Sequence, residues 1–200
     1  MTPVPLPLAR FRATFRAEAP LRLPEYVGSA WRGAFGHALK RAVCVTRMPR
    51  CAGCTLRSAC AYATIFESPP PPGATAMRKY NAAPHPFVLA PAEATQDIAA
   101  GDSLGLGLTL VGQAAAQLPY VLHALGEAGR SGLTRSRAPL VLDAVEQEAV
   151  PGAGDWHAIF QPGQPPAPLP AVVPPCPPVP AVATLEIATP LRLKREAAQA

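Results

Sequence analysis

Long apolar runs are missing from this sequence, and none approaches the roughly 18 to 20 residues that a helix needs to cross a bilayer. The first residues also lack the layout of a secretory signal, because Pro3, Pro5 and Pro7 interrupt them and Arg10 follows. We therefore expect a cytoplasmic protein without a membrane partner. In a reducing compartment, clustered cysteines are more often metal ligands or redox groups than disulfides.

Two motifs of familiar enzyme classes are absent as well. The sequence has no GxxxxGK[ST] and no HExxH. Nucleotide hydrolysis and zincin chemistry therefore find no support in it.

The composition fits a folded and moderately basic protein. Hydrophobic residues make up 49% of the 200, which is enough to bury a real core. The 18 Lys and Arg outnumber the 13 Asp and Glu and leave a net charge of +5. This excess favours polyanions or acidic partners, although many soluble proteins are equally basic.

Hydrophobic periodicity predicts an α+β fold. In residues 8–17, Phe11 and Phe15 alternate with Arg10, Arg12 and Arg16, the pattern of a half-buried strand whose other face is cationic. Apolar residues at helical spacing and turn signals predict the remaining elements. These are a helix over residues 24–43, strands over residues 86–90 and 101–112, a helix over residues 113–128 and a strand over residues 140–146. This order is that of a ferredoxin-like, RRM-like fold.

Proline sets the domain boundaries. Ten of the residues 162–180 are proline, which predicts a semi-rigid connector. We thus expect a first domain over residues 1–161, a linker over residues 162–181, and the first strand of a truncated second ferredoxin-like domain over residues 182–200. Cys176 lies within the connector and has no assigned role.

Four clustered cysteines follow the first predicted helix. Cys44, Cys51, Cys54 and Cys60 have the spacings C-x6-C, C-x2-C and C-x5-C, and the central CxxC is the usual way for two thiolates to reach one ion. These residues predict a metal-binding insertion over residues 44–60. Zinc in a structural role is the first candidate, an iron-sulfur cluster is the second, and the alternative is that some cysteines are small buried hydrophobes.

The polar face of the same helix carries the candidate chemistry. His37 shares it with Lys40 and Arg41, three and four positions later. An imidazole beside cations can take the proton of an RNA 2′-hydroxyl while the cations stabilise charge on the scissile phosphate. A solvated histidine on a basic helix is the competing interpretation. Gly33 and Gly36 on this face suggest close approach of a ligand or another backbone.

Further arginines could contact phosphates. One group flanks the cysteines, another lies in the glycine-rich residues 126–142, and one stands on the helix. A solvated loop is the alternative for each. The predicted RNA-binding residues are Arg32, Arg47, Arg50, Arg57, Arg130, Arg135 and Arg137.

Together these segments resemble the CRISPR-associated endoribonucleases of the RAMP superfamily, which process precursor CRISPR RNA. The likeness lies in residues 26–40 (YVGSAWRGAFGHALK), in the cysteine segment ending CAY at 60–62 and FE at 66–67, and in residues 84–89, 126–137 and 189–195. It covers most of the chain outside the connector. Relatives of this type continue well past residues 189–195 through a second domain, so the resemblance implies a truncated chain.

The resemblance implies an enzyme that binds the CRISPR repeat and cleaves it without a metal, leaving a 2′,3′-cyclic phosphate. His37 is then the best-matched general base, with Tyr26 and Lys40 or Arg41 assisting. The implied partners are repeat RNA, as precursor CRISPR RNA, and other CRISPR effector proteins. Two alternatives stay open: a noncatalytic RNA-binding subunit or truncated remnant, and a zinc-stabilised module that binds protein.

Overall fold

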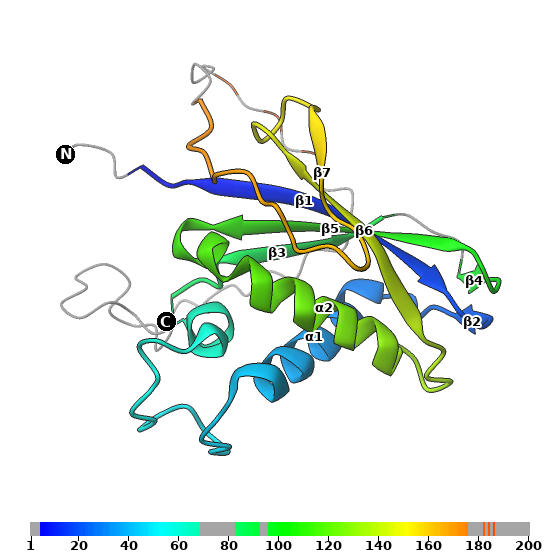
Figure 1. Cartoon of the computed structure of the whole chain (residues 1–200), viewed down its shortest axis with the longest axis horizontal. Coiled ribbons are helices and arrows are strands. Elements are labelled where there is room, and N and C mark those ends of the chain that lie inside the picture. Colours follow the sequence, from blue (N-terminus) through cyan, green and yellow to red (C-terminus); the bar gives the residue numbers. More distant parts are fainter. Residues whose placement is uncertain are drawn as a thin grey trace, which may run out of the picture.

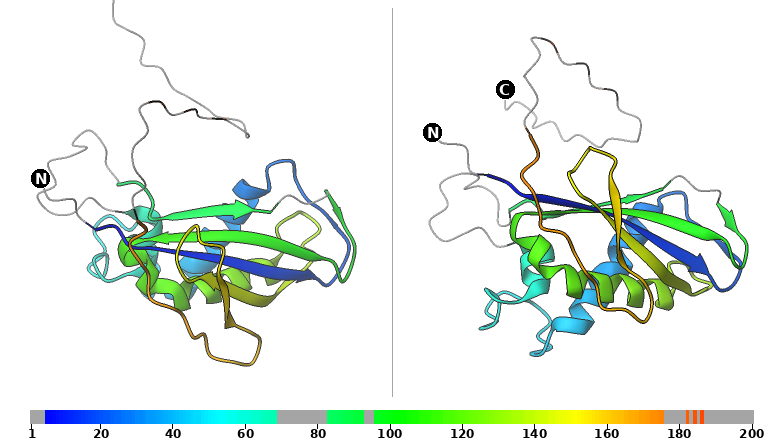
Figure 2. Two further views of the ribbon diagram at one scale, coloured as in Figure 1. Left: turned by 90° about the horizontal axis from the view of Figure 1, so that it is seen from above. Right: turned by 45° about the horizontal axis from the view of Figure 1, so that its top comes forward.

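A computed structural model describes residues 5–68, 83–92, 96–175 and the single positions 182, 184 and 186. One mixed sheet-and-helix unit accounts for the regular elements in these residues. Figure 1 shows a central sheet with helices α1 (Val27–Val43) and α2 (Leu118–Ser131) beneath it. Figure 2 shows that both helices lie on one side of the sheet, so the other side has no helix on it.

The main sheet has five strands in the order β3-β5-β1-β6-β7, and every neighbouring pair is antiparallel. The structure thus confirms the mixed class, and its order β1, α1, β3, β5, α2, β6 is the β-α-β-β-α-β connectivity typical of ferredoxin-like folds. The strands are β1 (Leu8–Ala17), β3 (Phe87–Pro91), β5 (Ser103–Val111), β6 (Leu140–Glu148) and β7 (Trp156–Phe160).

The alternation in β1 sets which face of the sheet is buried. Phe11 and Phe15 point into the core, where the ring of Phe15 lies 4.6 Å from that of Trp31 on α1. Leu104, Leu106, Leu108 and Leu110 of β5 extend the same apolar layer. Burial of this layer against the two helices is the main force that holds the unit together.

The outer face of β1 is not the free cationic surface that its arginines suggest. Arg10, Arg12 and Arg16 each meet a carboxylate of β6, at 2.7 Å from Glu148, 2.9 Å from Glu146 and 2.9 Å from Asp143. Sequence periodicity could not foresee this, because the acidic residues come from a strand more than 120 positions away. This face is therefore a ladder of ion pairs.

The helices begin later than the sequence indicates. α1 starts at Val27 after the N-cap residue Tyr26, so Pro24 and Glu25 precede it and its first turn has no acidic residue. The predicted second helix is divided into a 3-10 segment, η2 (Gly112–Gln117), and α2 itself, with Pro119 in the first turn. Proline is tolerated there because the first helical N–H groups have no partner within the helix.

Three short strands were not predicted. β2 (Leu21–Arg22) pairs with β4 (Asp97–Ile98) in a separate two-stranded sheet, and β7 extends the main sheet beyond β6. The two residues of β2 or β4 give no readable pattern, and the sequence of β7, WHAIF, does not alternate between apolar and polar residues. A π-helical turn, η1 (Ala63–Glu67), also follows the cysteines.

The first part of the proline-rich stretch is held against the sheet. Gln147 is 1% exposed, and its side-chain amide exchanges two 2.9 Å hydrogen bonds with the backbone of Leu169. Val172 forms an isolated bridge with Leu8 at the start of β1. Cys176 and nearly all of the predicted second-domain strand at 182–200 lie outside the described residues. In the part of the chain that is described, no helix combines the length and apolar character of a membrane span.

Candidate nucleic-acid interface

The polar face of α1 forms one exposed strip along the helix. Gly33, His37 and Arg41 follow one another at four-residue intervals and are all exposed, while Lys40 is half-buried beside them. The opposite face buries Trp31, Phe35, Ala38 and Leu39 in the core. The strip, defined here as Tyr26, Gly33, His37, Lys40 and Arg41, is therefore oriented outward by the packing of the apolar face.

His37 and Tyr26 do not meet. They are 11 positions apart along the strip, which corresponds to about 16 Å along a helix rising about 1.5 Å per residue. His37 has no hydrogen bond or ion pair among the described residues, and neither has the Tyr26 side chain. The structure thus brings His37, Lys40 and Arg41 together and leaves Tyr26 apart from them.

The two cations of the strip are already engaged by neighbouring segments. Lys40 Nζ donates a 3.1 Å hydrogen bond to the carbonyl oxygen of Pro49 and lies 5.4 Å from the ring centre of Tyr62. Arg41 Nη2 lies 3.5 Å from a carboxylate oxygen of Glu127 on α2. Lys40 thereby ties the cysteine segment to the strip, and Arg41 ties the strip to the second helix.

Arg32 points to a different side of α1. Its guanidinium lies over two aromatic rings, 5.4 Å from the centre of Phe66 and 5.0 Å from that of Phe87. The Phe66 ring also fills the space beside Gly36, where an added Cβ would come within 3.0 Å of it. Gly36 thus serves packing, whereas an added Cβ at Gly33 meets no described atom within 4 Å. That part of the strip can be approached closely from outside.

An open groove joins the start of α1 to the glycine-rich loop. It has a volume of about 840 Å³, and its lining includes Tyr26, Ser29, Arg22, Thr134 and Arg135. Arg22 was not predicted to be part of the site, since its only sequence signal is a single cation two positions before a proline. Arg135 and Tyr26, more than 100 positions apart in the chain, line the same groove.

The remaining arginines of residues 126–142 differ in their surroundings. Arg130 pairs with Glu127, which already holds Arg41. Arg135 and Arg137 are exposed and form no ion pair within the described ranges. The tight turn that presents them needs Gly132, whose φ of 77° is in the left-handed region and whose absent Cβ would fall 2.6 Å from the backbone of Arg137.

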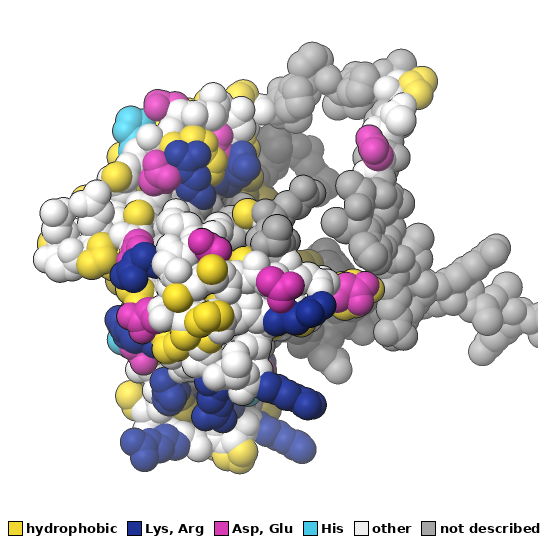
Figure 3. All heavy atoms as spheres, turned by 90° about the vertical axis from the view of Figure 1, so that its right-hand side faces the viewer, with side chains coloured by type: hydrophobic (Ala, Val, Ile, Leu, Met, Phe, Trp, Pro, Cys, Tyr) yellow, Lys and Arg dark blue, Asp and Glu magenta, His cyan; other side chains and the backbone are white. Residues whose placement is uncertain are grey.

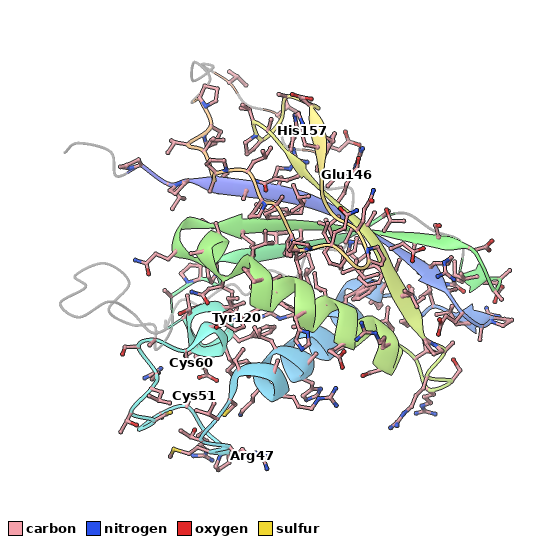
Figure 4. The ribbon with its side chains drawn as sticks, in the orientation of Figure 1. Arg47, Cys51, Cys60, Tyr120, Glu146 and His157 are labelled. Carbon is pink, nitrogen blue, oxygen red and sulfur yellow. The ribbon has the colours of Figure 1, made fainter. Side chains whose placement is uncertain are left out.

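The cysteine segment forms a lobe below α2. Figure 4 shows Cys51 and Cys60 on this lobe, Arg47 at its outer end, and Tyr120 of α2 close by. All four predicted cysteines are half-buried free thiols, and all four line one cavity of about 330 Å³. Even so, no three His, Cys, Asp or Glu side chains in the described residues are arranged as ligands of one metal ion.

Burial and neighbouring charge affect two groups in this lobe. Burial raises the pKa of the Cys51 thiol and the carboxylate of Glu67 raises it further, while Lys40 opposes them. Burial also raises the pKa of Tyr62, again with a contribution from Glu67 and smaller ones from Cys51, Cys44 and Cys60. The thiols and the phenol therefore share one electrostatic environment.

Three arginines surround the lobe. Arg47 and Arg50 are exposed, and neither forms an ion pair in the part of the chain described. Arg57 is half-buried, lines the cavity, and has a buried Nε without a hydrogen-bond partner among the described residues. Figure 3 shows that Lys and Arg side chains gather at the lower end of the molecule.

Comparison with known families identifies the unit. The AF_1859_N family, described as an N-terminal domain, matches residues 6–172. The chain belongs to this family. No curated protein sequence matches it.

Among solved structures, the chain is similar to one chain in the crystal structure of the Csm3-Csm4 subcomplex in the type III-A CRISPR-Cas interference complex. The identity is 10%, the TM-score is 0.45, and the alignment covers 73% of this chain and 82% of the other.

Proposed function

We propose that this member of the AF_1859 N-terminal domain family is the RNA-contacting domain of a CRISPR-associated RAMP-type protein, and that it holds the repeat RNA along the α1 strip. The observation that carries the proposal is the continuity of the strip. Its first residue, Tyr26, lines the groove that contains Arg135, and near its other end Lys40 bonds to the segment that carries Arg50. The strip thus connects two arginine-bearing segments that are far apart in sequence, one near each of its ends.

The chemistry of the strip suits a ribose-phosphate chain. Arginines donate paired hydrogen bonds to phosphates, and a phenol ring such as that of Tyr26 offers a surface on which an unpaired base can stack. Tyr26 is 59% exposed, so its ring is accessible. The absence of a side chain at Gly33 lets a strand lie close to the helix axis.

The helix-free face of the sheet is the weaker candidate. RRM domains bind RNA on such a face through exposed aromatic residues. Here the arginines of β1 are occupied by carboxylates of β6, and Trp156 lies 4.6 Å beneath the guanidinium of Arg12. Binding there would require these pairs to open, whereas Arg47, Arg50, Arg135 and Arg137 carry no such pairs in the described residues.

Cleavage of the bound RNA is the second candidate function, and the exposed, unpartnered His37 favours it. In this reaction His37 accepts the proton of a 2′-hydroxyl, the 2′-oxygen attacks the adjacent phosphorus, and the 5′-oxygen leaves with a proton from water. The products are a 2′,3′-cyclic phosphate and a 5′-hydroxyl. In this proposal Arg41 and Lys40 turn from Glu127 and Pro49 to stabilise the added negative charge. Tyr26, about 16 Å away, would contact a different nucleotide.

A single experiment separates the functions. Purified chain is incubated with end-labelled CRISPR repeat RNA in EDTA, and retention and product length are measured together. Retention with cutting supports both functions, and retention without cutting supports binding alone. No retention contradicts the proposal and leaves a role in binding protein, such as other CRISPR effector subunits.

Matched variants locate the interface. The double substitution K40Q/R41Q removes two charges from the strip, and R12Q/R16Q removes two from the sheet face. If RNA follows the strip, the first pair lowers affinity at least tenfold and reduces the salt dependence of binding, because fewer counterions are released. The second pair leaves both nearly unchanged. The reverse pattern would place RNA on the sheet.

A further inference from the structure

The four cysteines of the lobe occupy fixed backbone positions around one cavity. Cys44 caps the end of α1, where its N–H donates to the carbonyl of Lys40 at 2.9 Å. Cys51 and Cys54 are joined by a turn in which Cys54 N–H donates to Cys51 C=O at 3.1 Å, with Gly53 at a φ of 85°. Cys60 accepts a 2.9 Å bond from Thr64 as the next helical turn begins.

These thiols do not behave as ordinary core residues. A free cysteine that serves only packing is usually fully buried. Here every one of the four is half-buried, whereas Ala61, Ala63 and Ile65, which follow them directly, are 5%, 1% and 0% exposed. Fully buried positions thus follow the cysteines directly, but the thiols themselves line the cavity.

Arg57 supplies an independent observation. Its Nε is buried and unpartnered among the described residues, although a buried donor without an acceptor is destabilising. The backbone N–H of Arg57 donates a 3.1 Å hydrogen bond to the carbonyl oxygen of Cys54. The Arg57 side chain therefore begins at the cysteine turn, and it lines the same cavity. A ligand sulfur is the kind of acceptor that this donor lacks.

Charge balance agrees with this geometry. Four thiolates around one divalent cation carry a net charge of −2, which a half-buried lobe must neutralise. Arg50 and Arg57 line the cavity, and Lys40 bonds to Pro49 within the same segment.

We propose that Cys44, Cys51, Cys54 and Cys60 form a structural site for one Zn²⁺ ion, and that Arg57 donates its Nε–H to one of the ligand sulfurs. Binding draws the thiols to about 2.3 Å from the ion and releases one proton from each. The cavity of about 330 Å³ contracts as this happens. The test below measures metal binding directly, so the site stands or falls independently of the proposed function.

The test uses the full chain after removal of bound metal under reducing conditions. Zn²⁺ is titrated in, and Co²⁺ is added in a parallel sample to report thiolate ligation by its absorption bands. We expect saturation at about one equivalent and strong sulfur-to-cobalt bands, with four of the five cysteines protected from a thiol reagent.

Variants make the result decisive. C176S is the matched control and should retain the full stoichiometry, whereas C54S should lose the four-sulfur cobalt spectrum. Because C54S could unfold the lobe, R57Q provides a second test, and it should weaken Zn²⁺ binding by about tenfold or more with all four thiols intact. Equal reactivity of all five thiols with and without Zn²⁺ would overturn the site, and so would iron with visible absorption in the freshly isolated protein.

Discussion

Arg41 of α1 and Glu127 of α2 face each other across the two helices, with Nη2 and Oε2 3.5 Å apart. Glu127 also forms an ion pair with Arg130 at the end of its own helix. One carboxylate therefore pairs with a cation of the strip and with a cation in the last turn of α2. Glu127 therefore reduces the positive charge that this surface presents.

Replacing Glu127 should strengthen RNA binding. E127Q removes the one carboxylate that Arg41 and Arg130 share, so both become free for phosphates, and we expect affinity for repeat RNA to rise about threefold at low salt. The free energy of unfolding should change by less than about 1 kcal/mol, because these partly exposed pairs contribute little. Filter binding and urea denaturation measure the two effects. Weaker binding of E127Q would mean that Glu127 orders the site.

Loss of the His37 imidazole should abolish RNA cleavage and leave RNA binding largely intact. If His37 is the base, H37A abolishes cleavage of repeat RNA in EDTA while affinity falls less than about threefold, since a neutral imidazole contributes little to phosphate binding. H157A is the matched control, because His157 is also exposed but lies on β7 and pairs with Asp155. Cutting by H37A at the parental rate would exclude this base.

The two glycines of α1 should respond oppositely to alanine. G33A meets no described atom within 4 Å and should stabilise the helix by about 0.5 to 1 kcal/mol. G36A forces the Phe66 ring to move, so the same propensity gain is offset by lost packing. Thermal unfolding of both variants checks the difference. If G33A is stabilised yet binds RNA more weakly, the strand approaches the helix at this position.

Stability should fall in acid because of Glu148. Burial acts to raise the pKa of this 2% exposed side chain, but hydrogen bonds from the backbone of Gly152 and Gly154, together with Arg10, outweigh it and leave the pKa lowered. A carboxylate with a lowered folded-state pKa stabilises the fold at pH values above its ordinary pKa of about 4.3. This contribution is lost as the pH falls further, through the folded-state pKa.

Urea denaturation between pH 7 and pH 3 tests that sign. The parent should lose stability over the acidic part of the range, and E148Q should lose less, since it has no proton to take up there. E25Q alters an exposed glutamate and should follow the parent curve. A parallel loss in E148Q and the parent would assign the acid sensitivity to other groups.

Periodicity predicted the fold well where a segment is long and amphipathic. The bounds of β1 agree with the alternation of its arginines and phenylalanines, and both helices lie where apolar spacing indicates them. β2 and β4 were missed because two residues give no periodic signal, and β7 was missed because its sequence WHAIF does not alternate. The ion pairs of the β1 arginines could not be predicted either. The carboxylates opposite Arg10 and Arg12 lie on β6, and no local sequence pattern indicates which strand pairs with β1.

The candidate site was predicted in its parts but not in its arrangement. The helical spacing of His37 and Arg41 follows directly from the sequence. The position of Arg32 over Phe66, and of Arg135 in the same groove as Tyr26, depends on how distant segments pack. The metal preference of the cysteines and the roles assigned to the arginines stay predictions.

The hydrogen bonds of Gln147 have a practical consequence for isolating this unit. In a fragment that ends at residue 161, the buried side-chain amide of Gln147 would lose both of its hydrogen-bond partners on Leu169. Each buried polar group left unsatisfied costs about 1 to 3 kcal/mol of folding free energy. A fragment carried to residue 175 would retain Leu169 and the bridge between Val172 and Leu8. Residues 162–175 are thus a structural part of the domain, and their proline content reduces the entropy that is lost when they pack against the sheet.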